Sequence, residues 1–271
     1  PSNTLSALLT ASPANLYEAQ ISAKVGKRIQ QSARVPYGYR SIRFDKDTGF
    51  YLNGIHTKLK GVCVHHDGGC IGAAENRSAI ERQVDILTNM GCNAIRLTHN
   101  PFGAEYLDVC QRKGVLLVEE LFDGWTKVKK QKDFGRYFAD HYAEVVTSTI
   151  RRDWNNPAVI MWSLGNECKN PEILRTILVQ PYVNQMGETH VLHAYDPTRP
   201  WHYEQARDNF ATGIDVYSGM YETVEQMIAY AEAGHDTPYI ECEYEHAMGN
   251  AMGNFREYWD VYRAHPSLSG G

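Results

Sequence analysis

Two glutamates, Glu167 and Glu243, are placed where they could perform acid–base or nucleophilic chemistry. Glu167 comes shortly after the apolar run AVIMWSL at residues 158–164, and Glu243 lies within PYIECEY at residues 238–244. Two carboxyl groups flanking a glycosidic bond are what hydrolysis of a glycoside requires. One donates a proton to the leaving oxygen, and the other attacks the anomeric carbon or activates water. The pair makes glycoside hydrolysis a candidate chemistry.

The apolar run at residues 158–164 predicts a strand that is buried on both faces, as in a parallel sheet. Asn166 and Glu167 then fall at its carboxyl end, where barrel enzymes hold their reactive groups. On position alone, a solvated charge just past a strand explains Glu167 equally well. In the second segment either Glu241 or Glu243 could be the reactive carboxylate, because residues two apart on a strand share a face.

From residue 58 onward, apolar strand segments alternate with amphipathic helix segments. We predict strands at residues 59–65, 92–98, 115–121, 158–164, 201–205, 214–218 and 238–244. We predict helices at residues 77–90, 104–113, 134–154, 171–195 (interrupted at Pro181), 223–233 and 254–264. Alternation of this kind implies a parallel α/β sheet, and seven units favour a (β/α)8 TIM barrel. An open doubly wound sheet is the alternative, but the sequence has no G-x-G-x-x-G or Walker A loop.

Polar side chains follow each predicted strand, and in a parallel barrel all these strand ends open onto one face. In chain order they are His65, His66 and Asp67; Arg96, His99 and Asn100; Glu119, Glu120 and Asp123; Asn166 and Glu167; Glu204; Tyr217 and Tyr221; and Glu241, Glu243, Glu245 and His246. This convergence is much harder to obtain by chance than any single residue. It favours an active site with Glu167 and Glu243 facing each other across the barrel mouth.

Residues 1–57 have a different character, with strand patterns and no helical period. The strand-like pieces are at residues 17–25, 30–35, 39–44 and 50–55. Asn53 and Gly54 predict a tight hairpin turn in the last of them. The segment is too short for a complete sandwich of about 100 residues, so we predict the last strands of one. The chain then divides into residues 1–57 and a catalytic domain at residues 58–271.

Composition excludes several other classes. A net charge of −5 and a pI near 6.1 argue against a nucleic-acid partner. No run of 18 apolar residues is present, so no membrane partner is expected. The six cysteines form no C-x-x-C and fit no zinc template, and a reducing compartment is favoured. No signal peptide is visible, so we expect a cytoplasmic location in a bacterial cell, or a periplasmic one if a signal lies upstream.

Several other residues have simpler structural interpretations. His65 and His66 are adjacent on a strand and point to opposite faces, so they are not expected to share a metal ion. Glu119 and Glu120 are interpreted as charges that support the site residues or as structural charges. The remaining interpretations are a solvated basic loop for Lys127, Lys129, Lys130 and Lys132, a core position for Trp162, and a helix start at Asn76 instead of a glycosylation site.

Three stretches resemble known sequence motifs. RRDWNNPAVIMWSLGNE at residues 151–167 resembles the acid/base signature of glycoside hydrolase family 2. CEYEHAMGN at residues 242–250 resembles the nucleophile segment of the β-galactosidases in that family, and CNAIRLTHNP at residues 92–101 resembles its second-strand motif. DPTRP at residues 196–200 also fits the β-galactosidase branch. The motifs follow one another in the family's order over nearly the whole chain.

The resemblance implies a retaining, exo-acting β-galactosidase that works by double displacement. Glu167 would be the general acid/base and Glu243 the nucleophile, with the two carboxyl groups about 5–5.5 Å apart. Arg96 would fix the carboxylate of Glu243 and keep it ionised. The other substrate-binding residues that it implies are Asn166 (at the 2-hydroxyl), His99, Tyr221, His246, Glu204 and Asn100. β-Glucuronidase and β-mannosidase of the same family are the alternative activities.

The resemblance also implies a domain order and a partner. An immunoglobulin-like β-sandwich would precede the barrel, so residues 1–57 would be its last strands, and the barrel would stop where its eighth strand should begin. The substrate would be a β-galactoside, and the full-length enzyme would form a homo-oligomer. The alternative to an enzyme is a non-catalytic fragment. A barrel that lacks a strand leaves its first and seventh strands with open edges, which favours aggregation.

No cofactor and no metal ligands are assigned. Many β-galactosidases of the family hold Mg²⁺ through the acid/base glutamate together with a Glu and a His that follow the third strand. Here that stretch runs EELFDGW at residues 119–125 and has no Glu-x-His. Mg²⁺ stays an alternative because carboxylates, which hard cations prefer, are plentiful.

Overall fold

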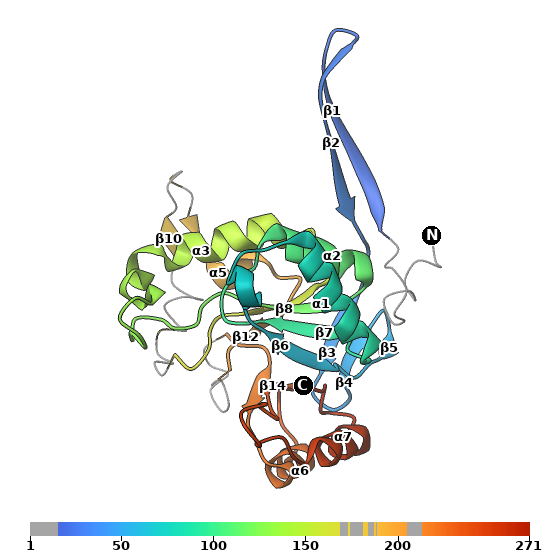
Figure 1. Cartoon of the computed structure of the whole chain (residues 1–271), viewed down its shortest axis with the longest axis vertical. Coiled ribbons are helices and arrows are strands. Elements are labelled where there is room, and N and C mark those ends of the chain that lie inside the picture. Colours follow the sequence, from blue (N-terminus) through green and yellow to red (C-terminus); the bar gives the residue numbers. More distant parts are fainter. Residues whose placement is uncertain (1–15, 169–172, 174–180, 184–186, 188, 205–212) are drawn as a thin grey trace.

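Parallel strands form the centre of the computed structural model, which describes residues 16–168, 173, 181–183, 187, 189–204 and 213–271. The main sheet has the order β12-β9-β8-β7-β6 and is parallel throughout (Figure 1). Its strands are β6 (Gly61–Val64), β7 (Ala94–Leu97), β8 (Leu116–Glu120), β9 (Val159–Ser163) and β12 (Trp201–His202). A second parallel pair joins β13 (Tyr217–Met220) to β14 (Tyr239–Glu243). The predicted α/β fold with a parallel sheet is confirmed.

Residues 269–271 connect the second pair back to the first strand of the main sheet. The Ser269 amide donates to the carbonyl of Tyr239 at 3.0 Å, and the Leu59 amide donates to the carbonyl of Ser269 at 2.8 Å. The Gly61 amide continues the ladder to Gly271 at 2.7 Å. The expectation of open edges on β6 and β14 is therefore wrong over this stretch, because the last residues lie between these strands and hydrogen-bond to both.

The helices follow the predicted spans closely. They are α1 (Arg77–Asn89), α2 (Ala104–Lys113), α3 (Phe138–Asp153), α6 (Val224–Ala233) and α7 (Phe255–Ala264). The side chain of Asn76 accepts a hydrogen bond from the Ala79 amide, which confirms the predicted helix start. Gly114 ends α2 in the left-handed conformation, at φ 74°. Figure 1 shows α6 and α7 lying together beside β14.

The predicted helix at residues 171–195 is wrong at residues 182–183 and 189–190. There the short strands β10 (Tyr182–Val183) and β11 (Thr189–His190) pair antiparallel, whereas Ile173 and α5 (Leu192–Tyr195) are helical as predicted. Pro181 lacks the amide hydrogen that a helix needs, and β-branched residues favour the extended conformation. Most of the remaining predicted span lies outside the described residues, as does Gln205 at the end of the predicted fifth strand.

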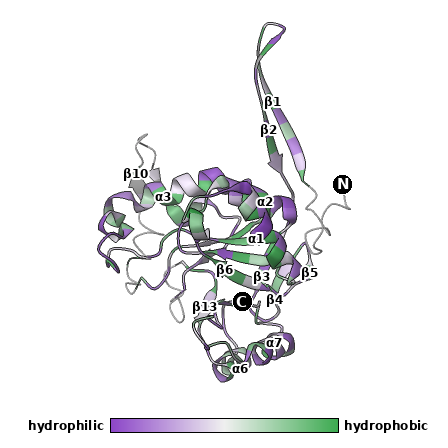
Figure 2. Cartoon of the chain, viewed as in Figure 1, coloured by the Kyte–Doolittle hydropathy of each residue, from purple (hydrophilic) through white to green (hydrophobic). Residues whose placement is uncertain are grey.

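The strands alternate between an inner and an outer face. On β7, Ala94 packs in an inner apolar cluster, whereas Ile95 packs in the outer cluster that α2 and α3 cover. The inner cluster collects side chains from β4, β7, β8, β9 and β14 and from the residues just before β6 and β13: Phe50, Leu52, Leu59, Ala94, Leu116, Val118, Ile160, Met161, Val216 and Ile240. Figure 2 shows these strands as mostly hydrophobic and the outer helices as mixed. Several strands therefore face one shared interior.

Two register shifts change which side chains point inward. Between β8 and β9, Leu117 pairs with Val159 and Val118 with Met161, so Ile160 is an extra residue. A bulge of this kind lets successive residues share a face and changes the direction of the side chains that follow. Trp162 consequently points outward into the core, where its exposed fraction is zero. This confirms its predicted core position.

The first strands form two antiparallel units. β1 (Tyr17–Val25) and β2 (Arg28–Tyr37) make a long hairpin that extends away from the rest of the molecule in Figure 1. β3 (Ile42–Asp45), β4 (Gly49–Leu52) and β5 (Ile55–His56) make a three-stranded sheet. The predicted turn at Asn53 and Gly54 is confirmed, with φ values of 54° and 79°. Phe50 and Leu52 of β4 pack in the inner cluster, so this sheet contacts the parallel strands directly.

None of the described helices combines the length and apolar character that a membrane span would need. All six cysteines are free.

Candidate active site

The carboxylate of Glu243 is held from two sides at the carboxyl end of β14. Arg96 donates from Nη1 to Oε1 at 2.7 Å, and the Tyr221 hydroxyl donates to Oε2 at 2.6 Å. His99 Nε2 lies 3.7 Å from Oε1. The side chain of Glu243 keeps an exposed fraction of 15%, so it is fixed in direction and still open to a ligand.

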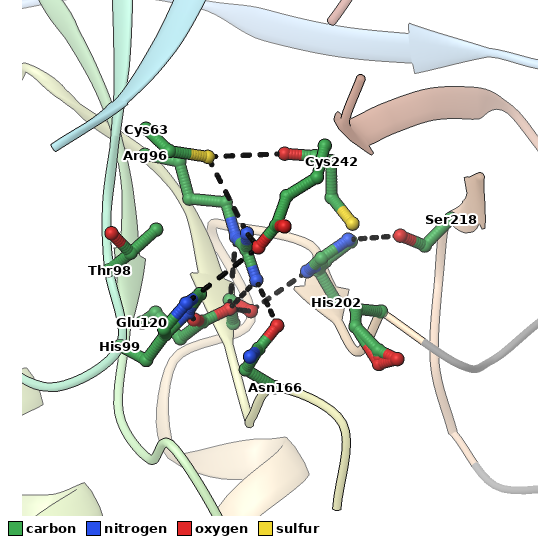
Figure 3. Close-up of polar contacts among 12 residues, drawn as sticks. Cys63, Arg96, Thr98, His99, Glu120, Asn166, His202, Ser218 and Cys242 are labelled. Atoms are coloured by element: carbon green, nitrogen blue, oxygen red, sulfur yellow. Dashed lines mark hydrogen bonds and ion pairs between the residues drawn. The ribbon is translucent and has the colours of Figure 1, made fainter. Parts of the chain in front are cut away.

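Arg96 is itself fixed by Glu120, at the end of β8. Nε and Nη2 both donate to Glu120 Oε2, at 3.1 and 2.7 Å, and Nη2 also donates to Asn166 Oδ1 at 3.1 Å. His99 Nδ1 lies 2.6 Å from Glu120 Oε1. Figure 3 shows these side chains converging from different strands. Three strand ends therefore position one guanidinium against Glu243.

Glu120 is fully buried but ionised. Burial opposes its charge, yet the positive charge of Arg96 and the hydrogen bonds from His99 and Ser163 lower the pKa of Glu120 to about 2. Ser163 donates to Oε2 at 2.6 Å and also contacts His202, which reaches Ser218 on β13. Burial lowers the pKa of His202 to about 3, so this histidine is neutral.

Replacing Glu120 with glutamine should destabilise the fold in a pH-dependent way. Because the pKa of Glu120 is lower in the folded state, its charge stabilises the fold fully above about pH 4.5. This stabilisation is lost as the pH falls towards about 2. We expect Glu120→Gln to reduce the unfolding free energy by about 3 kcal/mol at pH 7, since it leaves Arg96 without a buried counter-charge. Urea unfolding at pH 7 and pH 3 measures the unfolding free energy of both proteins, and the difference between Glu120→Gln and wild type should be smaller at pH 3.

The matched control is Glu119→Gln, on the outer face of the same strand. Burial and the neighbouring Asp153 raise the pKa of Glu119, so the substitution removes little charge and should change stability much less. If Glu120→Gln lowered the unfolding free energy by the same amount at both pH values, the assignment of a charge to Glu120 would be contradicted.

Glu167 lies in a tight turn after β9. A β-carbon on Gly165 would come within 2.7 Å of Cys168 Sγ and 2.9 Å of Trp125 Nε1, so only glycine fits there. Glu167 has a positive φ of 46°, and its amide donates to Glu204 Oε2 at 3.0 Å. The side chain of Glu167 is 50% exposed, and its carboxylate lies 3.9 Å from the Lys129 ammonium.

The structure separates the two glutamates of β14. Glu241 is buried, accepts a hydrogen bond from the Glu222 amide at 3.0 Å and contacts the Tyr239 hydroxyl. Gly219 pairs with Glu241 and Met220 with Glu243, so Cys242 is an extra residue in the strand. The prediction that Glu241 and Glu243 share a face is wrong, because this bulge shifts the alternation. Of the two carboxylates, only that of Glu243 is accessible.

Other predicted site residues lie further out or deeper. Asn100 and His246 are both exposed; Asn100 contacts His66, and the His246 ring lies 6.4 Å from that of Tyr221. Glu204 is buried and reaches the backbone of Glu167 instead of open space, and burial raises its pKa to about 7. A cavity of about 630 Å³ opens beside His99 and is also lined by His65, His66, Asn100, Phe122, Asp123 and Phe134.

The residues do not fit the Mg²⁺ site that the resemblance suggested. Asp123 is the first acidic residue beyond β8, and its Oδ1 accepts a hydrogen bond from Lys129 Nζ at 3.0 Å. The same ammonium faces Glu167, so these two carboxylates already share a cation that belongs to the chain. Within the described part of the chain, no three His, Cys, Asp or Glu side chains gather with the geometry of a metal site.

Glu120 supports Arg96 and His99, which is one of its two predicted roles, whereas Lys129 was predicted only as part of a solvated loop. Glu120 shares the strand parity of Leu116 and Val118, which point inward, so its position at the centre could have been inferred. Lys129 lies in a loop, and its contact with the turn after β9 has no signal in the sequence. Glu119 accepts a hydrogen bond from Arg152 at 3.3 Å on the outer face, away from this centre.

A family model described as "Glycosyl hydrolases family 2, TIM barrel domain" matches residues 45–271. A β-galactosidase of Bacteroides ovatus is 50% identical over 132 residues, which are 49% of this chain and 16% of that protein. A putative β-glucuronidase of Formosa agariphila is 39% identical over 154 residues, 56% of this chain and 15% of that protein. A β-galactosidase of Photobacterium profundum is 28% identical over 284 residues, 97% of this chain and 26% of that protein. The chain thus spans about a quarter or less of these relatives.

Solved structures show the same similarity. A glycosyl hydrolase family 2 member from Bacteroides cellulosilyticus superposes with a TM-score of 0.77 at 30% identity, covering 94% of this chain and 32% of the other. A β-glycosidase from Bacteroides vulgatus gives a TM-score of 0.80 at 25% identity, covering 94% of this chain and 39% of the other.

Proposed function

The chain belongs to glycoside hydrolase family 2, and from that premise we propose that it carries the catalytic centre of a retaining, exo-acting β-galactosidase. The observation that carries the proposal is the carboxylate of Glu243, which Arg96 and Tyr221 orient while it stays partly exposed. A nucleophile must be aimed at the anomeric carbon before the substrate arrives. Two donors fix the direction of this accessible carboxylate.

The proposed reaction has two displacement steps. Glu243 attacks the anomeric carbon while Glu167 protonates the leaving oxygen, which gives a covalent galactosyl-enzyme. In the second step a water molecule gives a proton to Glu167 and attacks the anomeric carbon. The bond to Glu243 breaks, and the sugar leaves with its configuration retained. Asn166 is placed between Arg96 and the turn at Glu167, where its amide can meet a sugar hydroxyl. His99 and Tyr221 provide further polar groups at this centre, and the exposed His246 and Asn100 would bind the more distant parts of the substrate.

We further propose that the parallel strands form a (β/α)8 barrel. The shared inner cluster and the ladder at residues 269–271 support closure of the ring. A single backbone hydrogen bond, from the Asp215 amide to the carbonyl of Trp201 at 3.0 Å, links β12 to the segment that precedes β13. In this proposal residues 1–57 are the end of an immunoglobulin-like sandwich in the whole protein, which acts as a cytoplasmic homo-oligomer.

The choice of sugar is tested with a panel of 4-nitrophenyl β-glycosides. We expect the β-galactoside to give the highest kcat/KM among the galactoside, glucuronide, mannoside and glucoside. The relative from Formosa agariphila makes β-glucuronidase the second candidate. A glucuronide preferred over the galactoside would replace the proposed substrate and keep the two-glutamate mechanism.

A further inference from the structure

The peptide unit between Asn166 and Glu167 is held at both ends by side chains from other parts of the chain. Lys129 Nζ donates to the Asn166 carbonyl at 2.8 Å, and Glu204 Oε2 accepts from the Glu167 amide at 3.0 Å. The carbonyl and the amide belong to the same planar group. Fixing both of them sets the orientation of that plane, and with it the directions in which the two side chains leave the backbone.

The loop that carries Lys129 has a defined shape. Asp133 accepts hydrogen bonds from the Lys130 amide at 3.0 Å and from the Gly135 amide at 2.9 Å. The Lys129 side chain is 24% exposed, and Asp123 accepts a hydrogen bond from its ammonium at 3.0 Å. A lysine that donates to two partners at these distances is not a solvated charge, so the predicted interpretation of this residue is wrong.

The same ammonium lies 3.9 Å from Glu167 Oε2. We propose that Lys129 is a positioning residue for proton transfer: it holds the Asn166–Glu167 peptide and draws the Glu167 carboxyl group toward the leaving oxygen of the substrate. This inference rests on the proposed role of Glu167 as acid/base.

The test compares Lys129→Met with Lys130→Met on two substrates that share a sugar. Methyl β-galactoside has a poor leaving group and needs protonation, whereas 2,4-dinitrophenyl β-galactoside leaves without it. General acid catalysis is worth about 10²- to 10⁴-fold. We expect Lys129→Met to lower kcat/KM for the methyl glycoside at least about tenfold and to change kcat/KM for the dinitrophenyl glycoside by less than about threefold.

Lys130 is exposed, and it uses its backbone amide to bind Asp133, so Lys130→Met keeps the loop and should match wild type on both substrates. Equal losses on both substrates in Lys129→Met would overturn the inference, because a structural defect does not depend on the leaving group. If the panel identifies another sugar, the same pair of aglycones is used with it. A wild-type enzyme inactive on every glycoside would instead contradict the proposed function.

Discussion

Replacing Glu243 with alanine should abolish turnover, with a loss in kcat on the order of 10⁶-fold, as when other covalent nucleophiles are removed. Without this carboxylate no galactosyl-enzyme can form, and Arg96 and Tyr221 lose the group that they orient. The alanine also opens space beside Arg96 for a small anion. Steady-state kinetics with 2,4-dinitrophenyl β-galactoside measures the loss.

Azide distinguishes this role from a structural one. In Glu243→Ala, azide should attack from the vacated side and restore activity, giving an α-galactosyl azide with inverted configuration. The control is Glu241→Gln, two residues away and buried against Tyr239 and Glu222. Azide should have no effect on this variant. Rescue of a Glu241 variant, or none in Glu243→Ala, would show that the nucleophile is misassigned.

Replacing Glu167 with alanine should produce a loss that depends on the leaving group. We expect kcat/KM for methyl β-galactoside to fall by about 10²- to 10⁴-fold, the usual worth of a general acid. The dinitrophenyl substrate should still form the galactosyl-enzyme quickly, because its leaving group needs no proton. Hydrolysis of that intermediate then lacks a general base, so the kinetics should show a burst followed by slow turnover.

The anomeric configuration of the azide product tests the role of Glu167 more directly than the rate does. Azide needs no general base, so in Glu167→Ala it should accelerate turnover and give a β-galactosyl azide of retained configuration. The two alanine variants thus control for each other, since the same anion should yield opposite anomers. An α-azide from Glu167→Ala would contradict the proposed roles.

The arrangement of strands and the gathering of polar side chains at their carboxyl ends were predictable because they depend on local patterns, whereas the contact of Arg96 with Glu243 followed from the resemblance. Period-two alternation on β7 places Arg96 on the inner face with Ala94, and the end of a parallel strand places it near Glu243. The apolar run at residues 158–164 places Asn166 and Glu167 at the carboxyl end of β9. These features need only the sequence of one segment and the rule that parallel strands open on one face.

The remaining features depend on contacts between segments. The extra residue Cys242 in β14 appears only in the register with β13, so the sequence could not show that Glu241 and Glu243 diverge. The helix predicted across Pro181 failed because short antiparallel pairing competes with helical propensity there. Lys129 reaches the peptide before Glu167 through tertiary packing of a loop, which no pattern within that loop records.

In the proposed mechanism, Glu243 forms a covalent bond to the sugar. Incubation with 2,4-dinitrophenyl 2-deoxy-2-fluoro-β-galactoside should trap the galactosyl-enzyme, because the fluorine slows both displacement steps and the aglycone favours the first. Mass spectrometry of the digested protein should then find one fluorosugar on the peptide that contains residues 238–244, with fragmentation locating it at Glu243. A label on Glu241, or rapid turnover with inverted product and no label, would contradict the account.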